Sequence, residues 1–168
     1  MNKILLIDGH SILNRAFYGV PPLTNFEGLH TNAVYGFINI MLKSLEDEHA
    51  DYIAVAFDLK APTFRHEMFA EYKGTRKPMP QELHEQVPVI KEVLAAMTIP
   101  VITLEGYEAD DILGTLAKRC QRDGFEVSIL SGDRDLLQLA DEHIKIRMPK
   151  TVKGQTSIEN YYPSDVID

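Results

Sequence analysis

Three carboxylates fall within four consecutive positions of the stretch 106–114. They are Glu108, Asp110 and Asp111, and they stand between an apolar run typical of a strand and an apolar-faced stretch typical of a helix. Acids are common in the first turn of a helix, where they interact favourably with its dipole. Three acids this close also repel one another. If acids from other segments join them, divalent metal ions are needed to neutralise the cluster.

Further acids follow the other expected strands. Asp8 and Asp58 each end a continuous apolar run, and Asp133 and Asp135 follow a third such run. Runs of this kind are typical of parallel strands buried on both faces, and the carboxyl ends of such strands lie along one edge of the sheet, where ligands bind. Any one of these acids could simply cap a helix. Seven acids from four segments instead predict one acidic crevice.

The donor chemistry of this crevice favours hard cations. All seven candidates are oxygen donors, and no paired Cys/His spacing indicates zinc. Carboxylates suit Mg²⁺ or Mn²⁺, and seven of them are enough for two ions. Two ions about 3.5–4 Å apart would suit in-line hydrolysis of a phosphodiester, one activating the water and the other stabilising the leaving oxygen.

The most basic segment of the chain, residues 59–80, has the opposite charge. Lys73, Arg76 and Lys77 could hold a phosphate there, and Tyr72 could stack on a base, although a solvated charged surface is the simpler interpretation. The formal net charge is −8, and the seven crevice acids account for all but one of that excess. The acidic balance is therefore local and does not exclude a nucleic-acid substrate.

Alternating strand and helix patterns predict the fold. The expected strands span residues 3–8, 52–58, 99–104, 126–130 and 143–148. We expect an α/β domain with a three-layer, doubly wound, mainly parallel five-stranded sheet and helices on both faces. Thr31 is expected to cap a long helix, and residues 150–158 are expected to form a hairpin or extension around Gly154.

Composition agrees with one soluble globular domain. The chain has 168 residues, 45% of them hydrophobic and 25% charged, which is enough for a compact core. Its single cysteine, Cys120, cannot form a disulfide within the chain and fits a reducing compartment. No signal-peptide cleavage site or membrane-spanning run is present. We expect a cytoplasmic monomer without a membrane partner.

Five motifs resemble those of a known family. In chain order they are Leu6-Ile-Asp8-Gly-His-Ser with Arg15 downstream, Ala56-Phe57-Asp58, Tyr72-Lys73-Gly-Thr-Arg76-Lys-Pro-Met-Pro80, Gly106-Tyr-Glu108-Ala-Asp110-Asp111 and Ser131-Gly-Asp133-Arg-Asp135. Together they cover essentially the whole chain. They make it similar to the 5′ nuclease domain of bacterial DNA polymerase I and to the related flap endonucleases.

This resemblance implies a PIN-like (resolvase-like) fold and an enzyme of replication and repair. The activity would be divalent-metal-dependent hydrolysis of DNA, or of primer RNA, near free 5′ ends or 5′ flaps, leaving a 5′-phosphate. The implied first metal site consists of Asp8, Asp58, Glu108, Asp110 and Asp111. Asp133 and Asp135 would contribute to the second. Lys73 and Arg76 would act in catalysis by steering the scissile phosphate, with Tyr72 and Lys77 beside them and Arg15 near the DNA path.

The resemblance also sets an expectation for domain organisation. The family continues into a helix–hairpin–helix type module that grips duplex DNA and supplies a further pair of aspartates to the second metal site. This chain ends at Asp168, in what is expected to be the first turn of a helix. We therefore expect residues 1–168 to form the N-terminal domain alone, with a polymerase as a candidate neighbour in the native chain.

Three alternatives share parts of this pattern. A PIN-type single-strand ribonuclease would have the acidic crevice but is not expected to have the basic insertion at 59–80. A phosphotransfer domain would use Asp8 as a nucleophile, but the related phosphatases usually place a second Asp two positions later, where this chain has His10. A non-catalytic nucleic-acid-binding domain would bind flap DNA without cutting it.

Overall fold

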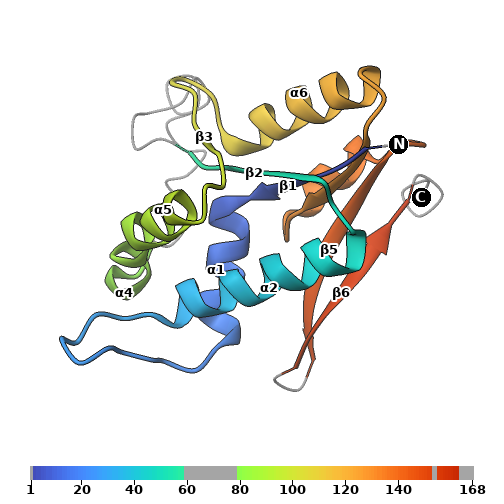
Figure 1. The fold of residues 1–168 in the computed structure, drawn as a ribbon. Coiled ribbons are helices and arrows are strands. Elements are labelled where there is room, and N and C mark those ends of the chain that lie inside the picture. Colours follow the sequence, from blue (N-terminus) through green and yellow to red (C-terminus); the bar gives the residue numbers. More distant parts are fainter. Residues whose placement is uncertain (1, 59–78, 153–154, 163–168) are drawn as a thin grey trace.

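A computed structural model describes residues 2–58, 79–152 and 155–162 of the chain (Figure 1). The described residues form one six-stranded sheet in the order β3-β2-β1-β4-β5-β6. Its strands are β1 (Lys3–Asp8), β2 (Tyr52–Ala56), β3 (Val101–Ile102), β4 (Glu126–Leu130), β5 (Ile144–Val152) and β6 (Gln155–Tyr161). All neighbouring pairs are parallel except β5 and β6. The expectation of a mainly parallel sheet is confirmed.

The predicted number of five strands was wrong. The fifth strand runs on to Val152, and the chain then folds back as β6, which pairs antiparallel with β5 from Gln155 to Tyr161. A hairpin or extension around Gly154 was expected, but a second arm was not counted in the sheet. This arm covers the edge of β5, whose backbone hydrogen-bonding groups would otherwise lack strand partners.

Helices cover both faces of the sheet, which confirms the three-layer arrangement (Figure 1). They are α1 (Gly9–Gly19), α2 (Asn32–Glu48), α4 (Gln81–His84), α5 (Gln86–Ala96), α6 (Ala109–Arg122) and the 3₁₀ helix η1 (Arg134–Leu139). Leu5 and Ile7 of β1 pack in the core beneath α1, α2 and α5. Leu6 packs in the second core, beneath α6. Alternate residues of one strand thus fill two cores, as expected for a strand buried on both faces.

Some element ends differ from the sequence-based expectations. The strand expected at 99–104 is only two residues long. Thr31 occupies the N-cap of α2, as expected, but its side chain makes no capping hydrogen bond. The apolar-faced stretch indicated a helix over residues 112–120, but α6 begins three residues earlier, at Ala109. That earlier start places Asp110 and Asp111 inside the first helical turn.

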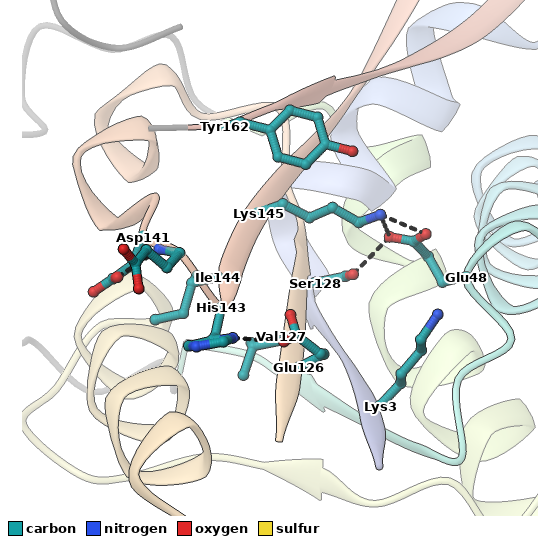
Figure 2. A pocket seen from close by; sticks show the side chains of 11 residues that line it. Lys3, Glu48, Glu126, Val127, Ser128, Asp141, His143, Ile144, Lys145 and Tyr162 are labelled. Atoms are coloured by element: carbon teal, nitrogen blue, oxygen red, sulfur yellow. Dashed lines mark hydrogen bonds and ion pairs between the residues drawn. The ribbon is translucent and has the colours of Figure 1, made fainter. Parts of the chain in front are cut away.

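An ion-pair cluster joins α2 to β4 and β5 away from the crevice. The Ser128 hydroxyl donates to Glu48 at 2.6 Å, and Lys145 Nζ donates to the same carboxylate at 2.7 Å. In Figure 2 the side chains of Ser128 and Lys145 both point toward the Glu48 carboxylate, and the Tyr162 ring lies over Lys145. Burial alone would raise the pKa of Glu48, but the hydrogen bonds from Lys145 and Ser128 hold it below its usual range. The adjacent pocket is lined by Lys3, Glu126 and His143 at the amino ends of β1, β4 and β5.

None of the helices within the described ranges has both the length and the apolar character needed to cross a membrane.

Candidate metal centre

The carboxyl ends of β1 and β2 place two acids side by side. The two strands are parallel and pair Asp8 with Ala56, so Asp58 follows two residues beyond the paired position. The Asp58 carboxylate accepts a hydrogen bond from the backbone N–H of Ala109, the first residue of α6. This contact ties the end of β2 to the start of α6, and it brings a third segment to the same edge.

The start of α6 holds the three clustered acids. Glu108 is the N-cap, and its capping box with Asp111 turns the carboxylates toward the helix start. Asp111 accepts from the Glu108 N–H at 3.3 Å, and Asp110 accepts from the Asp111 N–H at 2.9 Å. One oxygen of each of the three acids lies within 4.8 Å of the others. An all-carboxylate set at this spacing fits a hard divalent cation.

Burial and neighbouring charges both act on the Asp8 carboxyl. This side chain is only 7% exposed. Burial raises the pKa of the Asp8 carboxyl to about 7, and the nearby Asp58 and Asp133 carboxylates push it in the same direction. A hydrogen bond from the Ser131 hydroxyl and the backbone of Ser11 act against them. A bound cation would relieve this cost, because it favours the charged form of a carboxylate.

A second group of acids, Asp133 and Asp135, lies after β4. We call these two residues the second acidic wall. Asp133 caps η1 by accepting from the Asp135 N–H at 2.9 Å. A cleft of about 270 Å³ runs between α6 and η1, and Asp110, Asp111 and Asp135 line it. Asp135 therefore shares a cleft with two of the clustered acids, while Asp133 interacts with Asp8. The structure brings all seven predicted acids to one region.

Two serines of this region were not among the predicted site residues. Ser131 donates to Asp8 Oδ2 at 2.8 Å, and Ser11 Oγ accepts from the Gly132 N–H at 2.8 Å. Both serines belong to the motifs that contain Asp8 and Asp133. Their signal in the sequence was a small hydroxyl residue two or three positions from an acid, which also occurs in ordinary turns.

Close packing holds the ends of β1 and β2 together. A Cβ on Gly9 would lie 2.6 Å from the Phe57 ring, so only a glycine allows this approach. His10 contacts the same ring edge-on at 5.1 Å between centroids. Gly9 and Phe57 each adjoin a site acid, Asp8 and Asp58, so this contact controls the spacing of the two carboxylates.

The predicted nucleic-acid contacts are placed only in part. Arg15 of α1 lies beside the β4–η1 loop, because a Cβ on Gly132 would lie 3.7 Å from Arg15 Nη2. The remaining four fall outside the described residues: Tyr72, Lys73, Arg76 and Lys77.

Comparison with known families decides between the candidate classes. Residues 3–167 match the family described as the 5′-3′ exonuclease, N-terminal resolvase-like domain. The chain belongs to this family. As a member of it, the chain has the expected resolvase-like fold, with helices on both faces of a mostly parallel sheet.

Relatives and solved structures extend this result. The chain is 50% identical over 167 residues to DNA polymerase I of Geobacillus stearothermophilus, covering 99% of this chain and 19% of that protein. It thus spans about a fifth of that relative's length. A T5 5′-exonuclease structure with bound zinc ions has a TM-score of 0.67 at 21% identity, covering 93% of this chain and 58% of that one. A bacteriophage T5 flap endonuclease complex with DNA and metal ions has a TM-score of 0.68 at 20% identity, covering 96% of this chain and 58% of that one. At these identities the structural likeness shows the fold.

Proposed function

We propose that this chain is the metal-binding domain of a 5′-3′ exonuclease or 5′-flap endonuclease. The observation that carries the proposal is the convergence of acids from four segments at one edge of the sheet. Capping would not require acids from separate strands to meet. The tie between Asp58 and Ala109 and the cleft shared by Asp110, Asp111 and Asp135 make this a joint site.

The donor set supports Mg²⁺ or Mn²⁺, with two ions in the complete enzyme. The first ion would be held by Asp8, Asp58, Glu108, Asp110 and Asp111. The second would be held in part by Asp133 and Asp135. When bound, such ions supply a nucleophilic water at neutral pH and stabilise the charge on the leaving oxygen.

The chain's own residues prepare the site for a phosphodiester. Burial raises the pKa of Asp8 to about 7, and a cation held by this carboxylate would favour its charged form. Arg15 carries a positive charge beside the loop of Asp133 and would contact the nucleic-acid backbone. Lys73 and Arg76 would steer the scissile phosphate, with Lys77 adding positive charge and Tyr72 stacking on a base.

The proposed substrates are DNA with a free 5′ end or 5′ flap, and an RNA primer in the displaced strand. Membership of the 5′-3′ exonuclease family supports this substrate class. In the native protein the domain would act as a monomer beside a duplex-gripping helix–hairpin–helix module and a polymerase. The polymerase neighbour is supported by the DNA polymerase I relative, of which this chain covers 19%. The duplex grip and the missing ligands of the second ion would come from outside residues 1–168.

The direct test is cleavage of a 5′-flap DNA by the full-length native protein in the presence of Mg²⁺ or Mn²⁺, comparing the wild type with Asp111→Asn. The Asn side chain keeps an acceptor for the Glu108 N–H but loses the charge, so we expect cleavage to fall at least about 100-fold. Asp123→Asn, at the exposed far end of α6, is the matched control and should cut normally. Equal cleavage by the wild type and Asp111→Asn would reject the assignment. Preference for unpaired RNA would indicate a PIN-type ribonuclease instead.

A further inference from the structure

We propose that Ser131 and Ser11 are positioning residues that lock the second acidic wall to Asp8. The inference rests on the proposed function and assigns a role to two side chains that hydrogen-bond the acidic segments. The two hydroxyls fix the loop between β4 and η1, and that loop carries Asp133 and Asp135. We call this pair of hydroxyls the serine latch.

Ser131 links two of the acidic segments through a single oxygen. Its side chain is fully buried, at 0% exposure. The hydroxyl donates to Asp8 Oδ2 at 2.8 Å and accepts from the Asp133 N–H at 3.0 Å. A hydroxyl has one proton to donate and two lone pairs to accept with, so it can make both bonds at once. The direction of the Asp8 carboxylate and the position of Asp133 are thereby coupled.

Ser11 fixes Gly132, the residue between Ser131 and Asp133. Its Oγ accepts from the Gly132 N–H at 2.8 Å and lies 3.4 Å from Ser131 Oγ. A Cβ on Gly132 would lie 3.2 Å from Ser11 Oγ, so the loop fits closely against the start of α1. Two successive backbone N–H groups, those of Gly132 and Asp133, therefore bond to serine hydroxyls rather than to other backbone groups.

The latch has a consequence for metal binding. Side chains that hydrogen-bond a metal ligand orient it, and their loss typically costs about 10–100-fold in metal affinity or activity. Without the Ser131 hydroxyl, Asp8 can rotate and the Asp133 N–H loses its partner. We expect Ser131→Ala to weaken Mn²⁺ binding about 10–100-fold. The rate at saturating DNA should fall, while KM for DNA stays close to the wild-type value.

The chain offers a matched control on the same strand. Ser128 of β4 is also buried and also donates to a buried carboxylate, Glu48, at 2.6 Å. Its bond belongs to the ion-pair cluster that also contains Lys145 (Figure 2). The pocket beside this cluster is lined at the amino ends of β1, β4 and β5, whereas the acids follow the carboxyl ends of the strands. Ser128→Ala should lower the melting temperature without changing Mn²⁺ affinity. Ser44, whose fully buried hydroxyl has no hydrogen-bond partner among the described residues, provides a second control in Ser44→Ala.

The experiment combines calorimetric Mn²⁺ titration, thermal unfolding in EDTA and single-turnover flap cleavage at increasing Mn²⁺. We expect Ser131→Ala to bind Mn²⁺ more weakly than Ser128→Ala even if both melt at the same temperature. Additional Mn²⁺ should restore part of its cleavage rate. Equal Mn²⁺ affinity of Ser131→Ala and Ser128→Ala would overturn the inference.

A second variant keeps the inference testable if Ser131→Ala does not fold. Ser11 is only partly buried, so Ser11→Ala removes the other half of the latch at lower risk. It should also weaken Mn²⁺ binding, and unchanged Mn²⁺ affinity would overturn the inference. Failure of the proposed function is distinguishable, because the wild type itself would then neither bind Mn²⁺ nor cut the flap.

Discussion

The Asp58 carboxylate, just after β2, accepts a hydrogen bond from the backbone N–H of Ala109, the first residue of α6. One carboxylate therefore serves two purposes. It satisfies an N–H at the start of α6, and its negative charge adds to the acidic cluster formed by Glu108, Asp110 and Asp111.

These two purposes can be separated by substitution. Asp58→Asn keeps an oxygen acceptor for Ala109 but removes the charge, so it should weaken Mn²⁺ binding and leave the free energy of unfolding in EDTA nearly unchanged. Asp58→Ala removes both the charge and the acceptor. It should lower the free energy of unfolding by about 1–3 kcal/mol, because the Ala109 N–H is left buried without a partner. Chemical denaturation and Mn²⁺ calorimetry on the two variants check this. Equal stability of the two variants would show that the Ala109 bond contributes nothing.

Asp8 predicts how the stability of the metal-free protein depends on pH. Burial raises its pKa from 3.8 to about 7, so between these values the folded state binds a proton that the unfolded state has released. The contribution of Asp8 to stability is therefore greatest at low pH and is lost as pH rises through about 7. Asp8→Asn removes this dependence and should stabilise the protein in EDTA at pH 8 by about 1–3 kcal/mol.

Thermal unfolding in EDTA at pH 6 and pH 8 measures this effect. Saturating Mg²⁺ should stabilise the wild type at pH 8 but have little effect on Asp8→Asn. A variant less stable than the wild type in EDTA at pH 8 would contradict the account.

The contact between Gly9 and Phe57 predicts a steric effect. Gly9→Ala would place a methyl group 2.6 Å from the fully buried Phe57 ring, and such overpacking typically costs about 1–3 kcal/mol. The displaced ring adjoins Asp58, so Mn²⁺ affinity should fall as well. Gly114→Ala in α6 is the control, since its Cβ would be no closer than 3.6 Å to Leu139. The control should gain up to about 1 kcal/mol of helix stability. If denaturation curves showed Gly9→Ala to be more stable than Gly114→Ala, the packing argument would be refuted.

The ion-pair cluster should affect stability without affecting the metal centre. Lys145→Met removes a hydrogen-bond partner of the buried Glu48. It should lower the free energy of unfolding by about 1–3 kcal/mol and leave Mn²⁺ affinity unchanged. Loss of Mn²⁺ binding in Lys145→Met would show that the two ends of the sheet are coupled.

The lowered pKa of Glu48 gives a second prediction, for pH. The contribution of Glu48 to stability is present above its usual pKa of 4.5 and is lost as pH falls through the lower pKa of the folded state. Glu48→Gln should therefore show a weaker acid dependence of unfolding than the wild type.

Part of this structure could be predicted from the sequence. Asp8 and Asp58 were predicted to meet because buried parallel strands have an unambiguous pattern and their carboxyl ends share an edge. The place of β6 in the sheet was missed, since its pattern allows a hairpin or an extension and does not show whether a second arm pairs with β5. The latch of Ser11 and Ser131 was also missed. A serine's partner depends on how two loops meet in space, and the sequence pattern does not record that.

The central claim is that acids from four segments form one metal centre, and direct Mn²⁺ titration tests it. The variant Glu108→Gln preserves the size of a buried side chain in the cluster of Glu108, Asp110 and Asp111 and removes its charge. Glu126→Gln, at the amino end of β4 where Glu126 pairs with His143, is the control. We predict that the wild type and Glu126→Gln bind Mn²⁺ equally, and that Glu108→Gln binds at least about 10-fold more weakly. Equal affinity of all three proteins, or no binding by the wild type, would contradict the account.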